Sequence, residues 1–208
     1  MKENTNYSKI DSIFINNGGY ITREDIDNAN IPSWFLSDYV RRNKLIKVAP
    51  GFYSNESYFI DNYFVLQRRY PKYIYSGMTS LYLHHLTDKI PVDIEVTAPQ
   101  GYNPSRNKID NLSIRKISNN SIYNLGITEI ENKLGHIVKV YDQERTICDL
   151  IKYRDKYDGE TFIKAIKFYM RKTNNQNKLF EYARILKIEK KVFEIMEIII
   201  NNDCLKQE

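Results

Sequence analysis

The feature that most restricts the fold of this chain is the order of patterns in its first 58 residues. Tyr7, Ile10 and Phe14 recur at the spacing of one face of a helix, and the pair Gly18-Gly19 ends the pattern. Two more helical segments and a short hairpin follow. We therefore expect a small helical layer that carries a two-stranded ribbon.

The second and third helices have recognisable starts. Thr22 is a favourable N-cap for the second helix, and Ser33 is expected to cap the third, over residues 33–43. A hairpin over residues 45–53 follows, with a Pro-Gly pair at its tip. Three helices followed by a hairpin are typical of a winged helix-turn-helix, so we predict such a domain for residues 1–58.

The third helix has two different faces. Its apolar face suits packing on the first two helices, and its other face is polar and basic, the arrangement that a recognition helix needs in a major groove. The predicted DNA-binding residues are Thr22, Ser33, Trp34, Ser37, Asp38, Arg41, Arg42, Lys44 and Lys47. The alternative is an ordinary surface helix whose basic end complements the helix dipole.

These residues are expected to contact different parts of the DNA. Four of them, Ser33, Ser37, Asp38 and Arg41, would face base edges. The basic residues that follow Arg41 would contact phosphate, with Lys47 on the hairpin, and Thr22 would add a contact from the second helix. A tryptophan at position 34 either packs against a neighbouring domain or reads a base.

Charge supports this assignment by its position and not by its total. The net charge of +5 indicates a polyanionic partner only weakly. Residues 1–58 contain seven basic and seven acidic side chains, yet four of the basic ones fall between positions 41 and 47. The third helix and the hairpin therefore concentrate positive charge within a domain that is neutral as a whole.

Residues 59–208 predict a second domain of mixed α/β type that ends in a helical segment. The chain as a whole is therefore expected to have an α+β fold. The predicted helices are 59–70, 76–86, 142–153, 159–172, 177–187 and 190–201, and the predicted strands are 92–99, 112–117 and 136–141. Asp142 is expected to cap the helix that follows it, in which Glu144, Arg145 and Asp149 form a local ion-pair set.

Basic residues also line two helices of this second domain. They are Lys152, Arg154, Lys164, Lys167, Arg171 and Lys172, together with Lys156. Solvated helix faces often have this composition, but the cluster could also extend a phosphate-contacting surface. Both interpretations stay open.

Enzymatic chemistry is the main alternative from another class. Asp93 and Glu95 lie on one face of a predicted strand, as in a metal-dependent nuclease, but Thr97 stands where such enzymes usually carry a lysine. Adjacent His84 and His85 would point about 100° apart on a helix and cannot share a metal. We expect no catalytic residues, no metal and no cofactor. A third hypothesis is an interaction module whose C-terminal helices hold a protein partner.

Five blocks of the chain resemble one known family in the same order. They are "APGFYS", "RRYPKYIYSGMTSLYLHHLTDKIP", "IEVTAPQGY", "NLGITEIENKLGHIVKVYDQERTICDLI" and "AIKFYMRK…LFEYARIL". The sequence is similar in these blocks to the AbiEi antitoxins of type IV toxin–antitoxin systems, which act in bacterial abortive infection and phage defence.

The resemblance implies two activities. The N-terminal domain would bind inverted repeats in double-stranded DNA at its own promoter and repress transcription. The C-terminal domain would counter a nucleotidyltransferase-like toxin, without a stable complex between the two proteins. Since the sequence has no apolar run of about 20 residues and no signal-peptide core, and its two cysteines are widely spaced, we expect a cytoplasmic protein without a membrane segment.

Overall fold

The computed structural model describes residues 2–103, 110–171 and 175–204, which form two compact units. The first unit comprises residues 1–69 and 131–137, and the second comprises residues 70–130 and 138–208. The chain therefore crosses between the units at three points, and each unit is described by itself.

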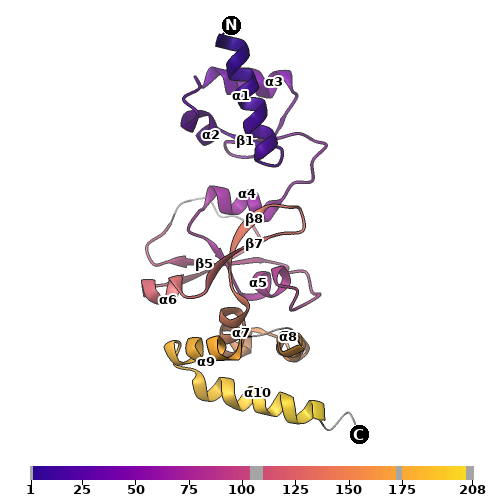
Figure 1. Cartoon of the computed structure of the whole chain (residues 1–208), viewed down its shortest axis with the longest axis vertical. Helices are drawn as coiled ribbons and strands as arrows, with labels where there is room; N and C mark the ends of the chain where they lie inside the picture. Colours follow the sequence, from indigo (N-terminus) through magenta and orange to yellow (C-terminus); the bar gives the residue numbers. More distant parts are fainter. Residues whose placement is uncertain (1, 104–109, 172–174, 205–208) are drawn as a thin grey trace. The chain divides into compact units, whose positions relative to one another are not determined.

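The first unit contains four helices and a three-stranded sheet among its described residues (Figure 1). The helices are α1 (Lys2–Asn16), α2 (Arg23–Asn28), α3 (Trp34–Arg42) and α4 (Asn62–Arg69), and the strands are β1 (Tyr20–Thr22), β2 (Ile46–Ala49) and β3 (Phe52–Ser54). Strand β3 lies between β1 and β2 and is antiparallel to both. The predicted order of three helices and then a hairpin is confirmed.

The core of the first unit joins α1, α2 and α3. Its buried residues are Ile10, Ile21, Ile26, Ile31, Phe35, Leu36, Tyr39 and Leu45. Helix α1 ends where Gly18 and Gly19 adopt positive φ values of 64° and 87°, a backbone conformation that glycine reaches without strain. The apolar face predicted for α3 is the face that this core buries.

Two predicted helix caps have different outcomes. Thr22 caps α2 as expected, because its side chain accepts the N–H of Asp25, whose carboxylate accepts the N–H of Thr22. The expectation for Ser33 is wrong. Its backbone is already helical and its side chain makes no capping bond, while the carbonyl of Pro32 accepts the N–H of Phe35.

A segment distant in sequence completes the first unit. Nδ1 of His136 lies 2.8 Å from Oδ2 of buried Asp61, and Nδ2 of Asn132 donates to the same oxygen over 2.6 Å. The His136 ring stacks on Phe64 at a centroid distance of 4.4 Å and meets Tyr20 edge-on at 5.5 Å. The turn that joins two strands of the second unit is therefore part of the first unit's hydrogen-bond network.

The second unit has a five-stranded sheet of order β6-β5-β4-β8-β7. The strands are β4 (Ile74–Tyr75), β5 (Ile94–Pro99), β6 (Leu112–Ile117), β7 (Ile127–Glu131) and β8 (Ile137–Tyr141). The helices are α5 (Gly77–Leu83), α6 (Asn120–Asn124), α7 (Gln143–Lys152), α8 (Gly159–Arg171), α9 (Gln176–Ile185) and α10 (Glu189–Cys204), with a 3-10 turn, η1, over Arg154–Lys156. Strand β5 is parallel to β6 and antiparallel to β4, so the sheet is mixed.

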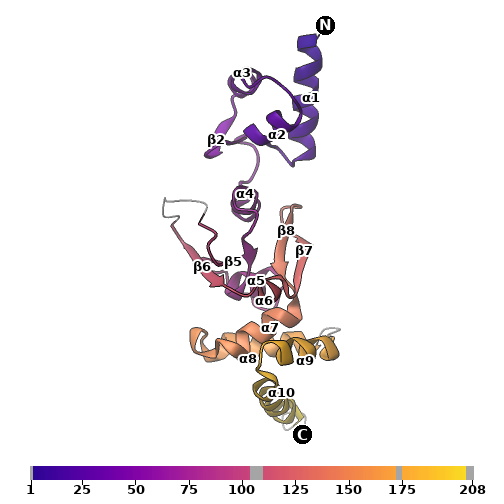
Figure 2. The ribbon, with the colours of Figure 1, turned by 90° about the vertical axis from the view of Figure 1, so that its left-hand side faces the viewer.

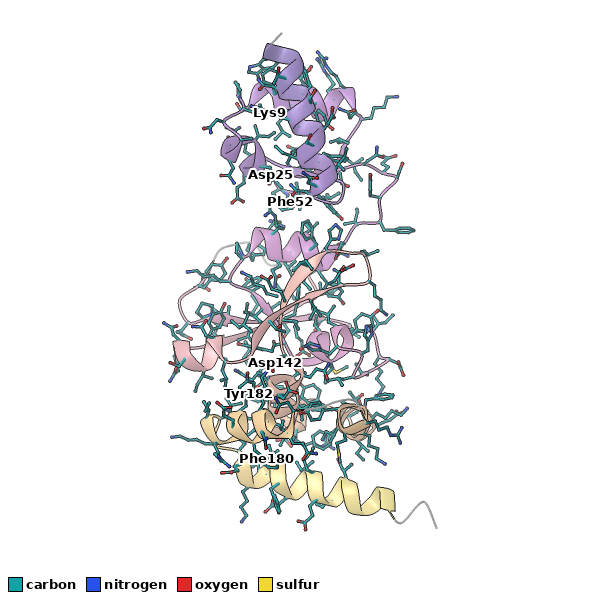
Figure 3. The ribbon with its side chains drawn as sticks, viewed as in Figure 1. Lys9, Asp25, Phe52, Asp142, Phe180 and Tyr182 are labelled. Carbon is teal, nitrogen blue, oxygen red and sulfur yellow. The ribbon has the colours of Figure 1, made fainter. Side chains whose placement is uncertain are left out.

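Helices α7 to α10 gather on one side of this sheet (Figures 1 and 2) and enclose the larger core. Asp142 caps α7 by accepting the N–H of Arg145, and its other carboxylate oxygen accepts the hydroxyl of Tyr182 on α9 over 3.1 Å (Figure 3). The predicted cap is thus confirmed. It also ties α7 to α9.

Two members of the predicted ion-pair set on α7, Arg145 and Asp149, form a buried pair, whereas Glu144 lies 3.6 Å from Lys178 on α9 instead. Arg145 is 1% exposed and Asp149 is 2% exposed, and Nε of Arg145 donates to Oδ1 of Asp149 over 3.2 Å. Nη1 of Arg145 also donates to the carbonyls of Ile122 and Leu125. The network therefore fixes α7 to the region around α6, as a structural role requires.

The prediction of a mixed fold of helices and sheets is confirmed. Every predicted strand and helix of residues 59–208 has a counterpart within the described residues. The short strands β1 and β4, the strand β7 and helix α6 were not predicted from the sequence. No described helix is both long enough and apolar enough to cross a membrane.

Candidate nucleic-acid interface

The polar side of α3 is open to solvent within the first unit. Trp34 is 52% exposed, the Arg41 side chain is 80% exposed, and Ser37 is also exposed. Residues at positions i, i+3 and i+7 of a helix share one side. Trp34, Ser37 and Arg41 therefore form one exposed row, which we call the α3 row.

Asp38, in contrast, is engaged by neighbouring side chains. Its carboxylate accepts a hydrogen bond from the hydroxyl of Tyr7 on α1. The same carboxylate pairs with Nη2 of Arg41 and with Nε of Arg42, and each of these two ion pairs measures 2.5 Å. The Tyr7 hydrogen bond is the main reason why the pKa of Asp38 lies below its usual value, with the two arginines adding to the effect. The expectation that Asp38 faces base edges is therefore not supported by its surroundings. It holds the two arginines in place instead.

Tyr7 is a member of this arrangement that the sequence does not predict. Helical spacing places it on the apolar face of the first helix, yet its hydroxyl reaches Asp38 and its ring centroid lies 4.8 Å from the guanidinium carbon of Arg42. The two partners are 31 positions apart. No local pattern links positions so distant, so only the packing of α1 on α3 reveals the contact.

The side chain of Thr22 is also buried and hydrogen-bonded within the first unit. Thr22 is 5% exposed, and its hydroxyl and backbone N–H are both bonded to Asp25. Asp25 in turn pairs with Arg68 of α4 over 2.9 Å. The expected DNA contact from Thr22 is therefore not supported, because the side chain that would make it is buried in the cap of α2.

The remaining predicted residues of the first unit are exposed. Ser33 precedes α3, Arg42 ends it, and Lys44 follows in the left-handed region with φ of 50°. Lys47 lies on β2, in the hairpin that β2 and β3 form around Pro50 and Gly51. The first unit therefore presents the α3 row to solvent, together with a hairpin that carries Lys47.

The auxiliary basic residues belong to the second unit. Lys164 pairs with Glu160 over 2.7 Å, and the Arg154 guanidinium donates to the Tyr157 carbonyl and lies 4.3 Å from the Phe162 ring centroid. Lys152 lies 5.8 Å from the ring centroid of Tyr153. Lys167 and Arg171 lie on α8. Lys172 falls outside the described residues. The extra phosphate surface stays a prediction.

The two carboxylates of the nuclease hypothesis lie in different surroundings. Asp93 is exposed, whereas Glu95 is partly buried against the start of α5, where its carboxylate accepts the N–H of Met78. Burial raises the pKa of Glu95. Over the described ranges, no three His, Cys, Asp or Glu side chains are grouped as metal ligands. The geometry therefore gives the nuclease hypothesis no support.

Comparison with known proteins bears on the first unit. Residues 8–55 match a family described as "Transcriptional regulator, AbiEi antitoxin", and this stretch contains α3 and the β2–β3 hairpin. The predicted resemblance to AbiEi antitoxins is confirmed over these residues. No curated protein matches the chain significantly. A crystal structure of the RV2827C protein from Mycobacterium tuberculosis is similar at a TM-score of 0.47 and 12% identity, covering 90% of this chain and 77% of that one.

Proposed function

We propose that this chain, which matches the AbiEi antitoxin family over residues 8–55, is an antitoxin and a transcriptional autorepressor that binds double-stranded DNA at its own promoter. One observation carries the proposal. Within the family match, α3 turns an exposed row of Trp34, Ser37 and Arg41 to solvent, and a hairpin with the exposed Lys47 follows the same helix.

The first unit acts as a winged helix-turn-helix in this proposal. Helix α3 enters the major groove, where Ser33, Ser37 and Arg41 meet base edges. Lys44 and Lys47 meet phosphate oxygens, as does Arg42 once its pair with Asp38 opens or is shared. Asp38 and Thr22 contribute indirectly, since the first orients the two arginines and the second caps α2.

The second unit carries the antitoxic activity in this proposal. The chain then opposes a nucleotidyltransferase-like toxin, and it does so without forming a stable complex. This part is supported by the family resemblance and by the presence of a separate, well-packed second unit. Its basic helix surface is a candidate for additional phosphate contacts when the chain is on DNA.

Footprinting of the region upstream of the gene tests the DNA-binding half of the proposal. The full chain should protect a pair of inverted repeats, and it should repress a reporter that is driven by the same region. Protection of no defined site, together with unchanged reporter output, would refute autorepression. Cleavage of the labelled duplex that requires a divalent metal and is lost in Glu95→Ala would favour the nuclease hypothesis instead.

Co-expression with the protein encoded next to this gene tests the antitoxic half. If that protein arrests growth, the full chain should restore growth while the two proteins elute separately on size exclusion. Stable co-elution would contradict the proposed mode of antagonism and would favour the interaction module. Absence of any rescue would refute the antitoxin assignment.

A further inference from the structure

The exposed indole of Trp34 is not explained by the packing of the first unit. It is the single tryptophan of the chain and lies at the first position of α3, with 52% of its surface exposed. Its neighbour Phe35 is buried at 3% exposure. An aromatic side chain left half in water at the start of this helix has surface available for a ligand.

The indole is nevertheless held in a defined orientation. Its ring stacks on Phe35 with a centroid distance of 3.8 Å and an interplanar angle of 24°. Phe35 is fixed in turn by the core and by an edge-on contact with Tyr7 at 5.1 Å. Because little freedom remains to be lost on binding, Trp34 offers a rigid apolar surface at the start of α3.

The position of the Trp34 indole limits which groups of the DNA it can contact. The N-terminal residues of a recognition helix contact base edges in the major groove. All four base pairs present polar atoms there, but the C5-methyl of thymine is the only methyl group among the unmodified bases. Serine at position 37 and arginine at position 41 continue the α3 row with polar chemistry.

We infer that Trp34 determines specificity by packing its indole against the 5-methyl group of a thymine in the operator. The inference rests on the proposed function, since it assumes that α3 enters the major groove. It assigns Trp34 a contact with one chemical group of one base, and it leaves hydrogen-bonded readout to Ser33, Ser37 and Arg41.

Deoxyuridine provides a direct test because it lacks only the methyl group of thymine. Each thymine of the promoter duplex is replaced in turn, and the affinity of the full chain is measured by fluorescence anisotropy with a dye on the DNA. Loss of one buried methyl group should weaken binding by about fourfold, from ~0.8 kcal/mol per carbon. At least one position should show this loss with the wild type and no loss with Trp34→Ala.

Two controls isolate the effect. Ile15→Ala removes another strongly exposed apolar side chain, from α1, and should keep the deoxyuridine sensitivity. A cytosine placed at the sensitive position should regain affinity when it is replaced by 5-methylcytosine, which returns the methyl group to the groove. The intrinsic fluorescence of Trp34 should also change on adding the promoter duplex and should change less with the deoxyuridine duplex.

The outcomes separate this inference from the proposed function. Uniform insensitivity to deoxyuridine, or sensitivity that persists in Trp34→Ala, overturns the role of Trp34 even if the chain binds its promoter specifically. If the chain does not prefer its promoter to a scrambled duplex, the proposed function itself fails. Sensitivity at one thymine that disappears in Trp34→Ala and persists in Ile15→Ala supports the inference.

Discussion

Arg145→Ala should destabilise the second unit strongly, because the guanidinium is buried and has three hydrogen-bond partners. It donates to the carbonyl of Ile122 over 2.7 Å, to that of Leu125 over 2.9 Å, and to Asp149 over 3.2 Å. Removing it leaves two carbonyls without this donor. The buried Asp149 keeps an ion pair with Arg115, at 3.2 Å, although these two atoms form no hydrogen bond within the described residues.

Breaking a buried ion pair by removing one partner costs roughly 3–5 kcal/mol. Since Asp149 retains Arg115, we expect about 3 kcal/mol in the free energy of unfolding. With an m-value of about 2 kcal/mol/M, the urea midpoint should fall by roughly 1.5 M. Far-UV circular dichroism of the full chain measures this midpoint, because the second unit holds most of the long helices that the structure describes.

Arg184→Ala is the matched control, because Arg184 is 68% exposed and pairs with the exposed Glu189 on the surface. Such pairs contribute about 0–1 kcal/mol, so its midpoint should shift little. A midpoint for Arg145→Ala within about 0.3 M of the wild type, equal to ~0.6 kcal/mol at that m-value, would refute the structural role given to Arg145.

Three further predictions concern single sites. Gly18→Ala should lower the thermal midpoint more than Gly51→Ala, because both positions have positive φ but only at Gly18 would a Cβ collide with His136; equal losses would contradict the packing of His136. In a Cys204→Ser background, a thiol reagent at pH 8 should modify Cys148 only after unfolding, since burial raises the pKa of this thiol to about 12; rapid labelling of the native chain would argue against that burial. Asp38→Asn should destabilise the first unit at neutral pH, where the lowered pKa of Asp38 favours folding, and the difference in midpoint should shrink as pH falls below the ordinary pKa of 3.8; a difference independent of pH would exclude the ion-pair role.

The element order of the first unit follows from local sequence signals. A glycine pair ends α1, a Thr-Asp capping box begins α2, and a Pro-Gly turn sets the hairpin, so three helices and a ribbon can be predicted without tertiary information. The apolar face of α3 is equally local, because helical periodicity alone defines it. The predictions that failed here, such as the cap at Ser33, depend on backbone angles that composition does not determine.

The hydrogen bonds and ion pairs of the candidate interface depend on contacts between residues that are far apart in the sequence. The engagement of Asp38 by Tyr7 arises from the packing of α1 on α3, across 31 positions. The pairing of Asp61 with His136 spans 75 positions and brings the turn between β7 and β8 into the first unit. Short strands such as β4, with two residues, have no measurable alternation and take their pairing from their neighbours in the sheet.

The most direct test of the account measures DNA affinity for four chains against the promoter duplex and a scrambled duplex. They are the wild type, Arg41→Ala, Lys47→Ala and, as a control that removes an exposed charge from α1 (Figure 3), Lys9→Ala. Arg41→Ala should lose about 1–3 kcal/mol on the promoter alone, and Lys47→Ala should weaken both duplexes alike and reduce the salt slope by about one. Promoter affinity that is unchanged in both Arg41→Ala and Lys47→Ala would contradict the assignment of α3 and the hairpin as the DNA-reading surface.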